Sequence, residues 1–191
     1  MEYEINQGNG YIKEYYHNGR IKYEGVLISG NICYGPIREY YRNGILLFEG
    51  EYLNGYRNGK GKVYYDNGNL LFEGEYLNGK KWNGKSYNIN GNIDYEIKDG
   101  IGNIKEYYDN GAILFEGEYI NGQKNGKGKE YYINGEVFIE GEYLNGLLNG
   151  KGKEYYDNGK LKCEGEYLNG LLNRKGKEYY DNGKLKYEGE Y

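Results

Sequence analysis

One short pattern recurs along the whole chain of 191 residues. Tyr-Tyr-x-Asn-Gly appears eight times, with one altered copy, and its glycines stand at positions 19, 44, 68, 91, 111, 135, 159 and 183. A second pattern, Glu-Gly-Glu-Tyr-Leu-Asn-Gly, stands between these copies, as at Glu73–Gly79 and Glu164–Gly170. A fixed period near 24 residues is typical of repeat proteins, in which each unit packs only against its neighbours. We therefore expect a single repeat array over residues 1–191.

Two shortened units indicate a second level of organisation. The segment after Tyr3 is four residues shorter than in the other units, and the segment after Tyr95 is shortened by the same length. Both segments lead into the sequence Ile-Lys-Glu-Tyr-Tyr. We infer that four units were duplicated, so that the two halves are residues 1–92 and 93–191.

Each unit has the sequence of a β-hairpin. Asn-Gly between two alternating runs of aromatic or β-branched residues is a strong hairpin signal, because a type I′ turn needs positive φ at both central residues. If Asn158–Gly159 forms this turn, Tyr156 lies opposite Leu161, and Lys153 lies opposite Glu164. The longer connections through Tyr-Leu-Asn-Gly would then lead from one hairpin to the next.

Strand periodicity separates two faces of each hairpin. Leu161, Cys163, Gly165 and Tyr167 share one face, and the lysines and glutamates between them share the other. The chain holds 34 glycines and 28 tyrosines, which supply turn positions and bulk for such a sheet. No segment shows a helical period. We expect an all-β protein, an elongated single-layer antiparallel β-meander of about sixteen strands, built from about eight 24-residue hairpin units.

The repeated residues resemble a known family. Phe72–Tyr76 and Tyr187–Tyr191, together with the Asn-Gly-Lys-Gly and Tyr-Tyr-Asp-Asn-Gly segments, are similar to MORN repeats, in particular to the MORN-variant form of the bacterial YwqK-family antitoxin-like proteins. The resemblance covers essentially the whole chain and is weaker at 26–36 and 80–99. It implies a β-meander without catalysis of its own, with roles in scaffolding, partner binding or dimerisation.

The supply of reactive side chains argues against an enzyme. The chain has one His, two Cys, two Ser and no Thr, too few for a catalytic triad or a Cys/His metal cluster. Pairs such as Glu73 and Glu75 recur in most units and face lysines such as Lys62, so cross-strand charge pairing explains them better than acid–base catalysis or Ca²⁺ binding. His17 occupies a variable turn position. We expect no catalytic residue, no cofactor and no metal site.

Charge and sequence ends bear on compartment and partners. The net charge is −4, and the two signs are mixed, so no basic patch favours nucleic acid or an anionic membrane. No signal peptide and no apolar run near 18 residues is visible. Cys33 and Cys163 lie about five units apart, too far for a disulfide. We expect a soluble, cytoplasmic protein.

The tyrosine after Gly-Glu is the candidate binding residue. In a single-layer sheet one face of these rings would stay accessible, and a row of them could bind an extended or helical peptide. A tyrosine ladder that only stabilises the sheet is the alternative. Trp82 has no counterpart in other units and is either a binding anchor or packing over a shortened loop. The candidate partner-binding residues are Tyr52, Tyr76, Tyr119, Tyr143, Tyr167 and Trp82.

These observations predict a non-catalytic scaffold that binds a protein partner through the aromatic face. The partner could be a peptide, a toxin, or a cytoskeletal or membrane-associated protein. The resemblance adds two alternatives: an antitoxin or immunity protein, and a peripheral phosphoinositide-binding protein. The strand that ends at Tyr191 has an open edge, which predicts a homodimer through this terminal strand.

Overall fold

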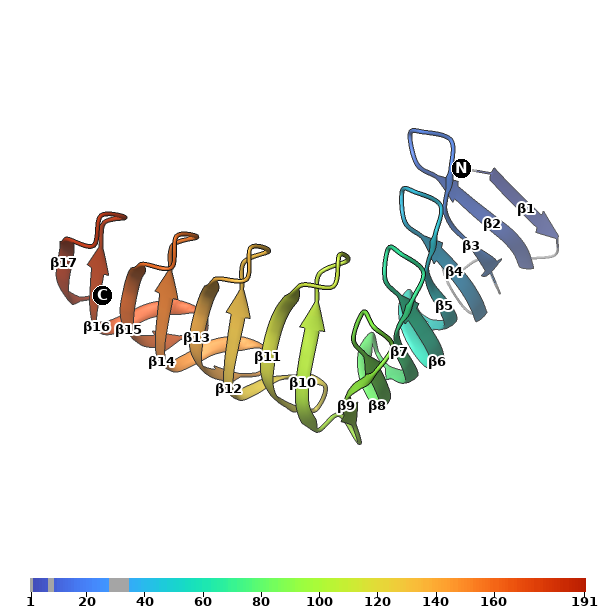
Figure 1. Ribbon diagram of the computed structural model, residues 1–191. Coiled ribbons are helices and arrows are strands. Elements are labelled where there is room, and N and C mark those ends of the chain that lie inside the picture. The colour runs from blue at the N-terminus through green and yellow to red at the C-terminus, as the bar shows by residue number, and fades with distance from the viewer. Residues whose placement is uncertain (1, 7–8, 28–34) are drawn as a thin grey trace. The chain divides into compact units, whose positions relative to one another are not determined.

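The computed structural model describes residues 2–6, 9–27 and 35–191. These residues form strands and turns, and no helix occurs among them. The chain divides into two compact units, Met1–Gly100 and Ile101–Tyr191. The first unit contains a nine-stranded sheet and the second an eight-stranded sheet, and in both each strand pairs antiparallel with its neighbours in sequence order (Figure 1). The predicted all-β antiparallel meander is confirmed, with seventeen strands in the described residues.

The strands are short and follow one another closely. Those of the first unit are β1 (Glu2–Asn6), β2 (Asn9–Tyr15), β3 (Ile21–Leu27), β4 (Gly35–Tyr40), β5 (Leu46–Leu53), β6 (Tyr56–Tyr64), β7 (Leu70–Leu77), β8 (Lys80–Tyr87) and β9 (Ile93–Ile97). Those of the second unit are β10 (Gly102–Tyr107), β11 (Ile113–Ile120), β12 (Gln123–Tyr131), β13 (Val137–Leu144), β14 (Leu147–Tyr155), β15 (Leu161–Leu168), β16 (Leu171–Tyr179) and β17 (Leu185–Glu190).

The type I′ turns lie at the Asn-Gly of the Glu-Gly-Glu-Tyr-Leu-Asn-Gly pattern. Asn145 and Gly146 have φ values of 52° and 89°, and Leu144 pairs with Leu147 across them. Positive φ at both central residues of a two-residue loop defines this turn. The hairpins of each unit therefore close tightly at this place, where the sequence had suggested a longer connection.

The other Asn-Gly has a different geometry. Among the residues of its loop only Gly159 has positive φ, at 75°. The amide of Gly159 donates to the carbonyl of Tyr156 (2.9 Å), and the amide of Tyr156 donates to the carbonyl of Lys160 (2.8 Å). This is a three-residue loop, a type I turn followed by a left-handed glycine that forms a G1 bulge. The prediction of a type I′ turn at Asn158–Gly159 was wrong, because a third residue enters the loop.

The bulge shifts the pairing only beside the turn. Tyr155, rather than Tyr156, pairs with Leu161. Beyond the bulge the register is the predicted one, with Lys153 opposite Glu164. The two predicted faces of the strand are therefore preserved.

Burial confirms these faces. Cys163 and Tyr167 are 7% and 4% exposed, whereas Lys162 and Glu166 on the opposite face are exposed. One face of each sheet is thus the core, and the opposite face carries the charged side chains. The core face also contains Phe48, Phe72 and Phe115, which are fully buried.

A second bulge explains how one sheet can bury its own rings. Gly117 pairs with Gly128, but Tyr119 pairs with Lys124, so three residues of β12 have a single residue opposite them. Gly126, in the middle of this bulge, has a φ of 67°. A bulge bends the strand that contains it. Figure 1 shows the strands curving toward the ends that carry the type I′ turns, while the Tyr-Tyr-x-Asn-Gly loops lie at the opposite ends of the strands.

Candidate functional site

The candidate tyrosines are held by glutamates of the preceding strand. Except at Tyr76, the hydroxyl donates to a carboxylate thirteen residues earlier in the sequence. The pairs are Tyr52–Glu39, Tyr119–Glu106, Tyr143–Glu130, Tyr167–Glu154 and Tyr191–Glu178. Burial, together with the bond to Glu39, raises the pKa of Tyr52 to about 12. Burial also raises the pKa of Tyr143 and of Tyr167.

Most of these rings are not accessible. Tyr76, Tyr119, Tyr143 and Tyr167 are each at most 8% exposed, and Tyr52 is half-buried. The expectation that one face of the rings stays open was wrong, because the bend of each strand folds the hairpin over them. A surface ligand therefore meets little of this row.

The tyrosines also pack edge-to-face on the phenylalanines of two successive hairpins. The ring of Phe115 lies 5.8 Å from Tyr119 and 5.6 Å from Tyr143, between ring centroids. Phe48 lies 5.8 Å from both Tyr52 and Tyr76. Such pairs add stability beyond the area they bury. The geometry favours the ladder that stabilises the sheet.

A row of covering residues closes this core, and the sequence reasoning missed it. The residue opposite the core tyrosine is a cation wherever the neighbouring core residue is Phe. Arg57 lies 4.0 Å from the centroid of Phe48, and Lys124 lies 4.4 Å from that of Phe115. Lys81 lies 4.8 Å from the centroid of Phe72. These are cation–π contacts in a largely dehydrated place.

The cover changes together with the core residue. Where the core residue is Ile139 or Cys163, the covering residue is Leu148 or Leu172. The Nη2 of Arg57 pairs with Glu39 at 3.0 Å, and Lys124 Nζ pairs with Glu130 at 2.8 Å, so these cations also have a counter-charge. The joint change of two positions from one repeat to the next was the available sequence signal.

The Tyr-Tyr pair serves both faces. The first tyrosine donates to a glutamate on the charged face, as Tyr155 does to Glu140 (2.6 Å). The second tyrosine joins successive repeats: its hydroxyl donates to the carbonyl of the next unit's first tyrosine. These hydrogen bonds between repeats are Tyr16–Tyr40, Tyr41–Tyr64, Tyr65–Tyr87, Tyr108–Tyr131, Tyr132–Tyr155 and Tyr156–Tyr179.

The glutamates face lysines across the strands, as predicted. Examples are Lys62–Glu73 (3.8 Å), Lys129–Glu140 (3.3 Å) and Lys153–Glu164 (3.8 Å). Both partners stay partly exposed, so each pair contributes little to stability on its own. Their recurrence supports a structural origin of the Glu-x-Glu pattern.

The remaining singular residues lie in ordinary places. Trp82 is half-buried in β8, and its carbonyl accepts a hydrogen bond from the amide of Gly100 (2.8 Å). His17 is an exposed turn residue, as predicted. The free thiol of Cys163 is buried beside the hydroxyl of Tyr167 (3.0 Å). Cys33 lies outside the described residues, so its predicted separation from Cys163 stays a prediction.

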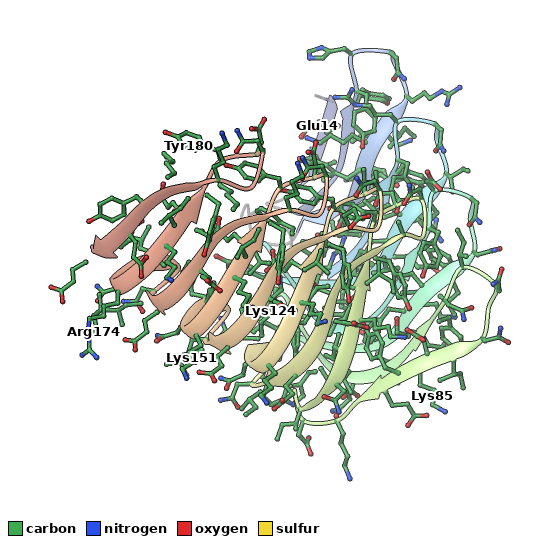
Figure 2. All side chains as sticks on the ribbon, turned by 60° about the vertical axis from the view of Figure 1, so that its left-hand side comes forward. Glu14, Lys85, Lys124, Lys151, Arg174 and Tyr180 are labelled. Carbon is green, nitrogen blue, oxygen red and sulfur yellow. The ribbon has the colours of Figure 1, made fainter. Side chains whose placement is uncertain are left out.

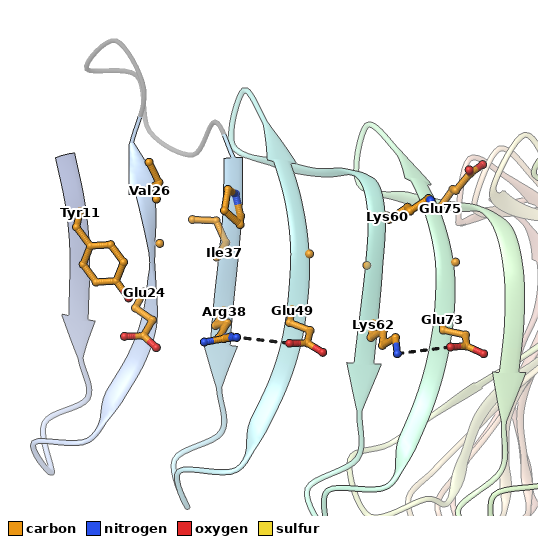
Figure 3. Close-up of a pocket in the computed structure, with 15 residues that line it drawn as sticks. Tyr11, Glu24, Val26, Ile37, Arg38, Glu49, Lys60, Lys62, Glu73 and Glu75 are labelled. Carbon is orange, nitrogen blue, oxygen red and sulfur yellow. Dashed lines mark ion pairs between the residues drawn. The ribbon is translucent and has the colours of Figure 1, made fainter. Parts of the chain in front are cut away.

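An accessible concave surface of the first unit lies on the charged face (Figure 3). It is a groove of about 760 Å³, whose floor is the backbone at Gly25, Gly50, Gly61 and Gly74. Side chains two residues apart along a strand share a face and lie roughly 7 Å from one another, which leaves a channel between two rows. Glycine is required beneath it, because a Cβ at Gly61 would lie 2.7 Å from the Phe48 ring on the core face.

The rims of the groove carry both signs. One rim holds the ion pairs Arg38–Glu49 and Lys62–Glu73, each 3.8 Å long, and the other holds Lys60 and Glu75. Tyr11, Val26 and Pro36 line one end, beside Ile37. Glu24 lies in the rim of Arg38 and Glu49, and the hydrogen bond that it accepts from Tyr40 (2.7 Å) lowers its pKa. Its carboxylate is therefore charged at neutral pH.

The second unit has a smaller hollow of about 410 Å³ near its bulges. Its lining includes Lys151 and Arg174, which lie toward the type I′ edge, while Tyr180 lies at the opposite edge (Figure 2). Within the described ranges, no three His, Cys, Asp or Glu side chains gather as metal ligands. Over the same described ranges, the chain has no helix of the length and apolar character that crossing a membrane requires.

Comparison with known families completes this picture. The MORN repeat variant matches residues 34–54, 57–78, 101–121, 148–169 and 175–191, more than half of the chain, and the MORN repeat matches residues 115–137. No curated protein matches the chain. The matched segments contain the core tyrosines Tyr52, Tyr76, Tyr119 and Tyr167, and Tyr143 lies between two of the segments. The chain belongs to the MORN repeat family.

Proposed function

We propose that the protein is a non-catalytic scaffold that binds a protein partner in the groove of its first unit. MORN repeats are generally protein- or membrane-binding motifs rather than enzymes. The observation that carries the proposal is the groove itself, which offers an open channel on the charged face while the aromatic face is occupied by its own core.

The chemistry of the groove suits an extended segment of polypeptide. Side chains at the floor positions would point to the core face, so the floor is bare backbone that an extended segment can approach. Rims of both signs favour a segment that carries basic and acidic side chains together. The apolar end at Val26 and Pro36 provides a place for one apolar side chain.

The rim of Lys60 and Glu75, which takes no part in the hydrogen bonds of the Tyr-Tyr pairs, provides the test. Lys60 lies opposite Glu75 in the first unit, and Lys127 lies opposite Glu142 at the same repeat position in the second. We expect the variant Lys60→Ala with Glu75→Ala to lose partners that the wild-type chain captures from cells of its source. The matched control, Lys127→Ala with Glu142→Ala, should retain them.

Mass spectrometry identifies the captured proteins, and calorimetry with the purified partner measures the loss. We expect a weakening of about tenfold or more in the groove variant. Equal capture by both variants would show that the groove is not the binding site. Absence of any captured protein would contradict the scaffold function itself.

The other expectations stay predictions. No described feature favours an antitoxin, and the mixed charges of the rims give no basic surface for phosphoinositides. The homodimer through β17, the last strand of its sheet, is checked by light scattering. A monomer that persists at high concentration would refute it.

A further inference from the structure

A row of exposed aliphatic side chains runs along the type I′ turns of the second unit. Its members flank the Asn-Gly pairs on both sides, and Leu171 is the most exposed of them, at 74%. The others are between 43% and 50% exposed. We name this set the turn row: Ile120, Leu144, Leu147, Leu168 and Leu171.

The type I′ turn does not require an apolar residue after Asn-Gly, the position of Leu147 and Leu171. A type I′ turn constrains its two central residues and leaves the flanking side chains free. At the place of Leu147 and Leu171, the chain itself has Gln123 in the second unit and Lys80 in the first. The hairpins that contain these polar residues close with the same geometry, as the φ values of Asn121 and Asn78 show. The turn therefore leaves Leu147 and Leu171 unexplained, whereas the position before Asn-Gly is Leu or Ile in the first unit too, at Leu53 and Leu77.

The turn row forms one continuous surface. Leu144 pairs with Leu147 across one turn, and Leu168 pairs with Leu171 across the next. The two pairs adjoin, because a Cβ at Gly170 would lie 3.9 Å from Cδ2 of Leu147. Leu144 and Leu168 lie on the charged face, two residues beyond Glu142 and Glu166.

The size of the turn row favours a small partner element. Five side chains of this exposure offer roughly 450 Å² of apolar surface, in the range that marks binding sites on soluble proteins. That is about half of what each partner contributes to a standard interface between two globular proteins. A second copy of this chain would need additional surface, whereas a single helix would not.

The spacing of the turn row matches a helix. Equivalent residues of successive hairpins are two strands apart, roughly 9.5 Å. Helix positions seven residues apart recur every 10.5 Å or so. A polyproline helix has a similar repeat, but its usual docking surfaces are lined by aromatic side chains, and the turn row is aliphatic. Strand addition is excluded because the backbone at the row is already paired within the sheet.

We propose that the turn row docks an amphipathic helix whose apolar residues recur at seven-residue spacing. The charged residues next to the row, such as Lys151 and Glu142, have both signs, which fits a helix whose apolar ridge is bordered by both acidic and basic side chains. This interaction is independent of the groove in the first unit.

The test uses fluorescently labelled peptides and the full chain. One peptide has three heptads, with leucine at the first and fourth positions of each heptad and Glu and Lys at the positions beside the leucines. A second peptide has the same composition in an order without this period, and a third is rich in proline. We expect the full chain to bind the first peptide at least about tenfold more tightly than the other two, by fluorescence anisotropy.

The variant Leu147→Gln with Leu171→Gln should weaken this binding about tenfold or more. Glutamine already stands at the equivalent position 123, so the fold is retained, and an unchanged unfolding midpoint verifies this. The matched control is Tyr56→Gln, the equivalent position in the first unit, which should bind like the wild type.

Three results would overturn the proposal. Equal binding of the periodic and aperiodic peptides would rule out an amphipathic helix as the occupant. Tighter binding of the proline-rich peptide would identify a polyproline segment as the occupant instead. Sedimentation that shows self-association of the wild type, lost in the double variant, would identify a second copy as the occupant.

Discussion

At the scale of single residues, Tyr76 differs from the other tyrosines of its row. Its side chain is 5% exposed, and its hydroxyl has no hydrogen-bond partner among the described residues. The equivalent tyrosines donate to a glutamate thirteen residues earlier, and at that distance from Tyr76 the chain has Val63. A buried hydroxyl without a partner loses its hydration for no return.

Removal of this hydroxyl should therefore stabilise the protein. We expect Tyr76→Phe to raise the free energy of unfolding by about 1 kcal/mol, because it removes an unsatisfied polar atom. The control is Tyr119→Phe, which loses a 2.7 Å bond to the carboxylate of Glu106 and should cost about 1–3 kcal/mol. Urea denaturation measures both. A loss of stability in Tyr76→Phe comparable with that of the control would contradict the explanation.

Arg174 stores backbone strain. Its φ is 61°, in the left-handed region, at a bulge where the preceding repeats have Gly150 and Gly126. A residue with a Cβ pays about 1–2 kcal/mol there, and the exposed ion pair with Glu166 returns little. After the greater flexibility of glycine in the unfolded chain is deducted, Arg174→Gly should gain about 0.5–1 kcal/mol.

The reverse change serves as the control for this prediction. Gly126 has a φ of 67°, and a Cβ there would lie 2.4 Å from a carboxylate oxygen of Glu118. We expect Gly126→Arg to lower the thermal midpoint and Arg174→Gly to raise it. If both changes moved the midpoint in the same direction, strain at the bulge would not be the cause.

At the scale of strands and turns, the sequence predicted one kind of order and missed another. Alternation within a strand depends only on a period of two, so the burial of Cys163 and Tyr167 and the pairing of Lys153 with Glu164 could be predicted. Turn type depends on how many residues enter the loop, and two Asn-Gly pairs in one repeat look alike in sequence. The bend at Gly126 depends on tertiary pairing. Without that bend, the burial of the candidate tyrosines could not be foreseen.

The paired cover and core residues give a prediction for a whole hairpin. In β13 and β14, Leu148 covers Ile139, whereas in β11 and β12 Lys124 covers Phe115. Leu148→Lys alone should destabilise the protein, because the buried ammonium lacks the phenylalanine face that Lys124 contacts. Leu148→Lys with Ile139→Phe should recover part of the loss, with a coupling energy of about 1 kcal/mol.

A double-mutant cycle measured by urea denaturation determines this coupling. Ile139→Leu with Leu148→Lys is the control, since it changes the core residue without supplying a ring. Additive effects in the Phe cycle, equal to those of the control, would mean that the cation and the ring do not interact.

At the scale of the whole molecule, tyrosine connects the repeats. Each of these hydrogen bonds from a second tyrosine hydroxyl reaches the next repeat and no further, as from Tyr132 to Tyr155. Stability is therefore built from contacts between neighbouring repeats. This accounts for a composition in which 28 of 191 residues are tyrosine.

The first tyrosines of the Tyr-Tyr pairs predict a loss of stability at alkaline pH. Burial, and then hydrogen bonds to glutamates, raise the pKa of Tyr40, Tyr64 and Tyr155 from 10.0 to about 12. The unfolded chain binds fewer protons than the folded chain between these values, so the stabilisation is complete below about pH 10 and is lost as pH rises toward 12. The free energy of unfolding, measured in urea at about pH 8, 10 and 11, should fall steeply over the last step.

Two further measurements bear on the cause of this loss. Absorbance at the phenolate band should show that part of the tyrosines ionise only with unfolding. The variant Tyr64→Phe with Tyr155→Phe has fewer tyrosines with a raised pKa, so its free energy of unfolding should decline less steeply with pH. At neutral pH its free energy of unfolding is lower than that of the wild type, because two hydrogen bonds to glutamates are lost. A decline of equal slope in variant and wild type would assign the alkaline loss to the lysines of the charged face instead.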